Sequence, residues 1–309
     1  MQYQKPALSL KDQALQLQQR GLTINDLQRV EHYLNHIGYY RLSAYCLTYE
    51  IPAAASQARS HQFQTGTTFE QVLGLYVFDR KLRLLVMEAI ERCEVAVRTG
   101  WAHAMSMRYG AHAHMDSKLF KDAWQHTQDL ARVANEIDKS RETFVQHYRS
   151  QYSEPFLPPI WAVVETMSLG TLSRWFANTH GTDAKKEVAQ SLGMPNIEVL
   201  EQVLHALTPV RNACAHHGRL WNRRFPIQLP AIKKYQASLV TPNSSHHQAH
   251  YLYNHLTILA LVMQRINPTG SWTSRVSALM ATELPRAQHT AMGFPADWAT
   301  RPAWKGGKP

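Results

Sequence analysis

The sequence contains few cysteines and no long apolar run. Its three cysteines, Cys46, Cys93 and Cys214, are far apart and odd in number, so neither a disulfide framework nor a CxxC metal site is predicted. The longest uninterrupted apolar run, Ile258 to Met263, is far shorter than the roughly 18 residues that a membrane span requires. The amino terminus from Met1 to Lys11 has no apolar signal core. We therefore expect a soluble cytoplasmic protein with no membrane attachment.

Several motifs of common enzyme classes are also missing. There is no internal repeat, no Gly-rich phosphate loop and no Gly-x-Ser-x-Gly elbow. The His-x-His pair at His112 and His114 has no Cys or carboxylate pattern to complete a ligand set, so no metal site is predicted. No cofactor is expected either.

Positive charge is in excess. The chain has 309 residues, with 33 Lys and Arg against 23 Asp and Glu, which gives +10 with neutral histidines. This balance suits a polyanionic partner without saying which one. The hydrophobic content of 44% is ample for a buried core in one large domain or two moderate ones.

Positive charge is concentrated after the apolar run from Val203 to Val210. The stretch from Arg211 to Arg224 holds four arginines, two histidines and two asparagines, and no carboxylate. If a helix runs from Ile197 to Leu220, Asn212 and His216 lie one turn apart on one face, and Arg219 follows three residues later.

These residue types suit work on a phosphodiester. The guanidinium of Arg211 offers a planar fork of donors to a phosphate and stays protonated. A histidine such as His216 suits proton transfer because the unperturbed pKa of its residue type is about 6.5. Together they indicate phosphodiester chemistry without a metal. The alternative is a solvated cap, since cations favour the carboxyl end of a helix.

The rest of the chain predicts helices and no convincing strand. Apolar residues recur at helical spacing from Phe69 to Tyr109, and further helices are expected over 10–20, 22–37, 160–178, 182–192, 251–266 and 272–284. The fold class is therefore all-α, a helical bundle with an amino-terminal helical annex. We predict a helical module and connector over 1–60, the bundle over 61–285, and a tail over 286–309 that docks on the bundle.

Two further groups could contact RNA. Tyr39, Tyr40 and Arg41 combine aromatic rings with a cation, which can stack unpaired bases, although the tyrosines could equally pack the annex on the bundle. Glu94 and Arg98 are expected beside the main motif, one turn apart, where they could form an ion pair. Arg98 and His103 could in principle supply a second half-site, but no asparagine follows Arg98.

Several separate blocks resemble one family in the same order. The Arg-Asn-x-x-x-His pattern is the signature of the HEPN superfamily of RNA-cleaving helical domains, and RNACAHHGRLWNR resembles its form in abortive-infection proteins of the AbiD/AbiF type. The other blocks are KPALSLKDQALQLQQRGL, YLNHIGYYRLSAY, FDRKLRLLVMEAIERCEVAVR, PPIWAVVETMSLGTLSRWF and MGFPADW.

The resemblance implies a HEPN-like bundle and a metal-independent endoribonuclease toxin. The 2′-hydroxyl of RNA would attack the adjacent phosphate, leaving cyclic 2′,3′-phosphate and 5′-hydroxyl ends. Arg211 would hold the phosphate, Asn212 would orient His216 or the phosphate, and His216 would act as general acid or base. Auxiliary RNA contacts would come from His217, Arg219, Asn222 and Arg223.

The resemblance also implies partners. HEPN domains generally place two motifs across a two-fold axis, so we expect a homodimer with its site at the contact. A small non-coding RNA could restrain the toxin, and a protein antitoxin stays possible. Two other readings remain: a non-catalytic RNA-binding protein that uses the same basic helix, and a helical scaffold whose motif stabilises a dimer.

Overall fold

The computed structural model describes residues 2, 4, 6–53, 59–241 and 250–305. Within these residues the regular elements are helices, and β-pairing is limited to isolated bridges, which confirms the all-α fold class. The α-helices are α1 (Leu10–Gln19), α2 (Leu27–Ile37), α3 (Tyr39–Cys46), α4 (Phe69–Tyr109), α5 (Ala123–Lys139), α6 (Thr143–Gln151), α7 (Ile160–Val163), α8 (Leu169–Asn178), α9 (Asp183–Ser191), α10 (Ile197–Ala215), α11 (Leu252–Ile266) and α12 (Trp272–Glu283).

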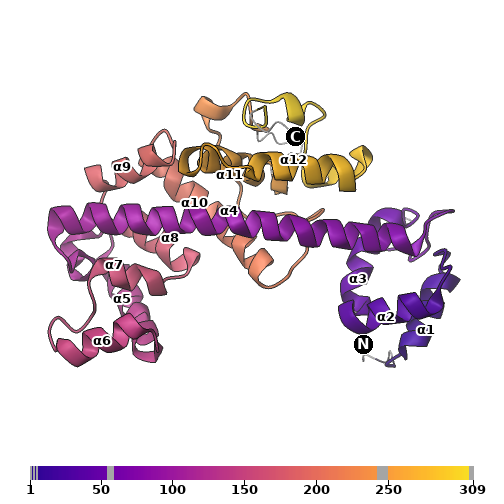
Figure 1. Ribbon diagram of the computed structural model, residues 1–309, viewed down its shortest axis with the longest axis horizontal. Helices are drawn as coiled ribbons and strands as arrows, with labels where there is room; N and C mark the ends of the chain where they lie inside the picture. Colours follow the sequence, from indigo (N-terminus) through magenta and orange to yellow (C-terminus); the bar gives the residue numbers. More distant parts are fainter. Residues whose placement is uncertain (1, 3, 5, 54–58, 242–249, 306–309) are drawn as a thin grey trace. The chain divides into compact units, whose positions relative to one another are not determined.

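The chain forms two compact units. Unit 1 comprises residues up to Lys81 together with Thr282–Leu284, and unit 2 comprises Leu82–Ala281 and the chain from Pro285 onward. The division falls within α4, which Figure 1 shows as one uninterrupted helix. The predicted boundary near residue 60 lies in the connector, and five of the connector's residues, 54–58, lie outside the described part of the chain.

The first turns of α4 belong to unit 1 because they pack on α2 and α3. The hydroxyl of Tyr45 donates to the buried carboxylate of Asp79 at 2.7 Å, and Arg29 forms an ion pair with Glu70 at 2.7 Å. A buried carboxylate needs such a donor, because an unpaired one is costly to remove from water. Contacts of this kind, rather than the connector, set the limit of unit 1.

In unit 2 the helices α8 and α10 pack extensively on each other. Gly170 of α8 permits the close approach, because a Cβ placed there would lie only 3.3 Å from the methyl carbon of Thr208. On α4, Gly100 does the same for Val188 of α9. Helix α12 is joined to α4 by a bond from the Trp272 indole to the Leu85 carbonyl at 2.7 Å.

The residues after α12 cover part of the unit 2 core. The Trp304 ring is buried and its indole nitrogen donates to the Thr257 hydroxyl of α11 at 3.3 Å. The Ala303 carbonyl accepts a bond from Gln264 at 3.0 Å. The tail assigned to 286–309 is thus in contact with α11 over its described part, and residues 306–309 lie outside the description.

Some predicted elements have other limits. Helix α2 begins at Leu27, not at residue 22, because the Asp26 side chain caps it by accepting from the Arg29 amide at 3.0 Å. The helix expected over 160–178 is interrupted after α7, and α8 restarts behind the capping hydroxyl of Ser168. No helix in the described part of the chain combines the length and apolar character needed to cross a membrane.

Candidate functional site

Helix α10 carries the basic motif and is anchored on its apolar face. The Asn196 side chain caps the amino end by accepting from the Val199 amide at 2.9 Å. Eight buried residues then follow at helical spacing and fix the helix in the core: Leu200, Val203, Leu204, Ala206, Leu207, Val210, Ala213 and Cys214.

The opposite face of α10 is exposed to solvent and polar. Gln202, His205, Asn212 and His216 are all exposed. At about 100° per residue they fall within one narrow stripe. The prediction that Asn212 and His216 share a face one turn apart is therefore confirmed by the helix itself, in which the His216 amide bonds to the Asn212 carbonyl at 3.0 Å.

The helix ends earlier than predicted, at Ala215 and not at Leu220. The amide of His217 bonds to the Cys214 carbonyl at 3.0 Å, and the amide of Gly218 bonds to the Ala213 carbonyl at 2.7 Å. This pair of bonds is the Schellman termination. His217 takes the left-handed position, with φ of 55°. Arg219 therefore lies beyond the helix and does not continue the face of His216.

The turn after α10 is held by buried neighbours. A Cβ on Gly218 would lie only 3.1 Å from the Ala213 carbonyl oxygen, so a side chain there would crowd the termination. The buried Arg83 of α4 donates to the Gly218 carbonyl at 3.4 Å. Leu220 and Trp221 are fully buried and fix the chain that follows. Sequence reasoning missed Arg83 because it lies within the apolar repeat of a core helix.

The left-handed position of His217 gives a testable prediction. A Cβ is crowded at this φ, so His217→Gly should be more stable than His217→Ala. We expect its free energy of unfolding to be about 0.5–1 kcal/mol higher, a value that already includes the greater freedom of glycine in the unfolded chain. Both variants lack the imidazole, so the comparison isolates the backbone. Urea denaturation measures the difference, and equal stability of the two variants would contradict the assigned termination.

Arg211 points to the other side of the motif. It is half-buried and interacts electrostatically with Glu94 of α4, as does Arg98. Burial raises the pKa of Glu94, and the charges of Arg98 and Arg211 oppose this shift. Arg98 forms the predicted ion pair with Glu94 and also donates to the Met167 carbonyl. The Glu94 carboxylate is thus close enough to Arg211 for their charges to interact, while Arg98 is its ion-pair partner.

The other predicted residues lie in different surroundings. Arg223 and Arg224 are exposed, whereas Asn222 is half-buried at φ of 49°. The guanidinium carbon of Arg219 lies 5.8 Å from the centre of the Trp221 ring, and that of Arg223 lies 5.9 Å from the Phe225 ring. His217 is exposed next to His216. This part of unit 2 is thus a cationic surface that continues from the end of α10.

His103 does not join Arg98 in a second site of the same form. The guanidinium of Arg98 is directed to Glu94, to the Met167 carbonyl and, at 3.7 Å, to Glu165, whereas His103 is exposed farther along α4. Tyr39, Tyr40 and Arg41 belong to unit 1. The structure therefore brings together Arg211, Glu94 and Arg98 on one side, and Asn212 and His216 on the other.

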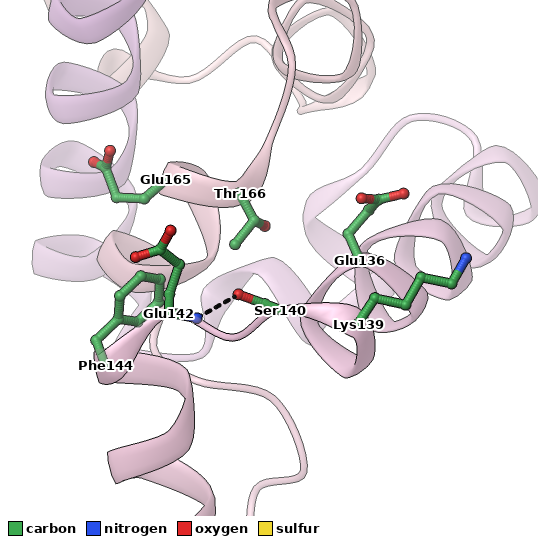
Figure 2. A pocket seen from close by; sticks show the side chains of 7 residues that line it. All are labelled: Glu136, Lys139, Ser140, Glu142, Phe144, Glu165 and Thr166. Atoms are coloured by element: carbon green, nitrogen blue, oxygen red, sulfur yellow. Dashed lines mark hydrogen bonds between the residues drawn. The ribbon is translucent and has the colours of Figure 1, made fainter.

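A cavity of about 570 Å³ in unit 2 has a different character. Figure 2 shows the side chains of Glu142 and Glu165 on one side of it, and those of Glu136 and Lys139 on the end of α5. Three carboxylates against one ammonium make this cavity unsuitable for a phosphate. One of its carboxylates, Glu165, lies 3.7 Å from the guanidinium of Arg98, which also pairs with Glu94.

Metal-ligating side chains do not gather elsewhere in the described residues. No group of three or more His, Cys, Asp or Glu there is arranged to hold a metal ion. None of the three cysteines forms a disulfide, and all three are buried.

The fold and the motif define an all-α protein with a cationic, histidine-bearing surface at the end of a core helix. A family model described as Abi-like protein matches residues 32–222, which is more than half of the chain. The chain belongs to this family, and membership associates it with abortive infection, a form of phage defence. No curated protein and no solved structure matches it.

Proposed function

We propose that the chain is a metal-independent endoribonuclease of the HEPN type, acting as the toxin of an abortive-infection system. One observation carries the proposal. Asn212 and His216 are exposed side by side on the last turn of α10, and Arg211 is adjacent to them and backed by a buried carboxylate. Arg211 lies on the other side of the same turn, and its long side chain can turn back toward the face of His216, so that a phosphate donor fork and a proton-transfer group can reach one phosphate.

The chemistry uses the RNA and these side chains from two copies of the chain. The 2′-hydroxyl oxygen attacks the adjacent phosphorus and gives its proton to the neutral His216 of one copy, and the bond from phosphorus to the 5′-oxygen breaks. His216 of the other copy donates a proton to the leaving 5′-oxygen, Arg211 stabilises the charge on the phosphate oxygens, and Asn212 orients the phosphate or the imidazole. The products are a cyclic 2′,3′-phosphate and a 5′-hydroxyl.

A single His216 cannot comfortably supply both the acid and the base. We therefore propose a homodimer in which two motifs meet across a two-fold axis, with one histidine in each role. The exposed stripe from Gln202 to His216 supports this, because it leaves the polar face of α10 available to a second copy. Light scattering that gives the mass of one chain in an active sample would contradict the dimer.

A nuclease of this kind requires restraint in its own cell. The cationic surface from Arg219 to Arg224 supports a small non-coding RNA as the antitoxin, and a protein antitoxin is the other option. The same surface favours a second candidate function, in which the chain binds RNA without cutting it. The two functions differ in whether the covalent structure of the RNA changes.

The deciding experiment uses protein purified from a host that lacks the proposed antitoxin. RNA is incubated with it in EDTA, beside a matched strand with 2′-deoxyribose at every position. We expect cleavage of the RNA only, with 5′-hydroxyl ends that accept phosphate from polynucleotide kinase and with cyclic phosphate at the other end. Intact RNA, or equal cutting of the deoxy strand, would refute the proposed reaction.

A further inference from the structure

Unit 1 contains a cavity of about 970 Å³, at the upper end of the range for small-molecule sites. It is lined by helix α1, by Pro6 and Leu8 before it, by the junction of α2 with α3, and by Arg59 and His61. Leu8, Leu10 and Leu34 supply an apolar lining. The space is therefore large enough for one or two nucleotides and offers an apolar surface to a base.

The charged groups that line this cavity are all basic types. Arg20, Arg59 and His61 contribute to its wall, and none of the described residues that line it carries a carboxylate. The Arg59 guanidinium is fixed by Glu50 through a bond of 2.7 Å and donates to the Ser43 carbonyl at 3.0 Å. Glu50, which does not line the cavity, thus partly balances the charge of Arg59. Arg20 is therefore the better partner for an anion.

Two tyrosines stand where α3 meets the cavity. The Tyr40 side chain is 92% exposed, which is unusual for so large a ring. Tyr39 is half-buried and its hydroxyl accepts a bond from Arg20, which orients the guanidinium. An exposed flat ring beside a cation and an apolar lining is the combination that stacks an unpaired base and holds its phosphate.

We propose that this cavity binds one or two unpaired nucleotides of a single-stranded RNA. One base stacks on Tyr40 and contacts the leucine lining, and Arg20 binds a phosphate. The family match begins at residue 32, so α1 and Arg20 lie before it. The site is distinct from the α10 motif. The inference rests on the proposed function in one respect, the choice of RNA as the bound strand. Binding at this site does not require cleavage.

The test measures binding of a short, fluorescein-labelled RNA of mixed sequence that carries 2′-O-methyl groups throughout. This probe lacks the attacking hydroxyl and cannot be cut by the proposed reaction, so the active full-length chain is used. Fluorescence anisotropy gives the affinity at one fixed salt concentration. Tyr40→Ala should weaken binding about tenfold, within the range for loss of one stacked base.

Matched variants make the outcome specific. Tyr40→Phe keeps the ring and should bind like the wild type, and Tyr152→Ala removes an exposed tyrosine of unit 2 and should have no effect. Tyr40 is exposed, so its replacement should leave the fold intact, which circular dichroism verifies.

Wild-type affinity in Tyr40→Ala, equal weakening in Tyr152→Ala, or no binding of the probe by the wild type would each overturn the proposal. The nuclease proposal can fail independently of this one. In that case unmodified RNA would stay intact while the methylated probe still binds.

Discussion

Replacing His216 with alanine is expected to lower the rate of RNA cleavage by roughly 10²- to 10⁴-fold, the range typical of a lost general acid or base. The side chain is exposed at the end of α10, and the bonds that terminate the helix come from backbone atoms. The variant should therefore fold and associate like the wild type while losing the chemistry. Single-turnover cleavage of a defined RNA measures the effect.

His205 provides the matched control for this experiment. It is also an exposed histidine of α10 and lies in the same stripe, two turns before Asn212. At protein concentrations where light scattering shows the dimer intact, His205→Ala should cleave at nearly the wild-type rate. If His216→Ala cleaves normally, or if both variants lose activity together, His216 is not the proton donor and α10 should be studied as an RNA-binding surface.

The non-catalytic alternative makes a different set of predictions for the same protein. A clamp that binds phosphates should lose affinity in Arg211→Ala and show a shallower dependence of binding on salt, while His216→Ala stays unaffected. A scaffold would instead dissociate or unfold in Arg211→Ala. Affinity, salt dependence and mass thus separate the nuclease, the RNA clamp and the scaffold.

The sequence predicts α4 correctly because apolar residues recur at spacings of three and four along most of its length, from Leu75 to Val97. The start of α10 is equally clear, since Pro195 and the capping Asn196 precede an apolar run. Its end is missed because histidine, and not the usual glycine, occupies the left-handed position of the termination. The pairing of Glu94 with Arg98 follows from their spacing alone.

Helix α5 shows why some elements could not be predicted. Its buried face includes His126 and Asp129 together with Val133 and Ile137, so the apolar period is broken by polar residues. Asp129 is stabilised there by Arg174 of α8, a contact between residues far apart in the sequence. The break in the apolar period at His126 and Asp129 is what hides this helix from the sequence pattern.

Only part of the candidate site could be predicted from the sequence. The shared face of Asn212 and His216 follows from helical periodicity, which the sequence contains. The position of Arg211 against Glu94, and the hold of Arg83 on Gly218, depend on how α4 packs against α10. The spacing of residues along one helix does not show which distant helix packs against it. The positions of Glu94 and Arg83 beside the motif are therefore known only from the structure.

The second large effect is expected on stability, from breaking the ion pair between Arg98 and Glu94. The Arg98 side chain is 14% exposed and that of Glu94 is 9% exposed, so removing one partner leaves a charge in a poorly solvated place. We expect Arg98→Ala to lower the free energy of unfolding by about 3–5 kcal/mol, as for other broken buried pairs. Urea denaturation at neutral pH measures the loss.

The same helix offers an internal control for that value. Arg92 and Glu88 form a pair with the same spacing, but their side chains are 42% and 29% exposed and 3.6 Å apart. Solvent screens such a pair, so Arg92→Ala should cost no more than about 1 kcal/mol. Similar losses in Arg92→Ala and Arg98→Ala would show that burial is not what makes the inner pair important.

The pH dependence of Arg98→Ala tests the cause of its instability. Burial already raises the pKa of Glu94, and loss of the Arg98 charge should raise that pKa further. A carboxyl whose pKa is higher in the folded than in the unfolded state binds its proton more readily when folded, so stability falls as pH rises between the two values. The loss of unfolding free energy in Arg98→Ala should therefore become smaller as the pH is lowered toward the ordinary pKa of a carboxyl group. Glu94→Leu in the same chain should remove this pH dependence, because no buried carboxylate then remains to be neutralised.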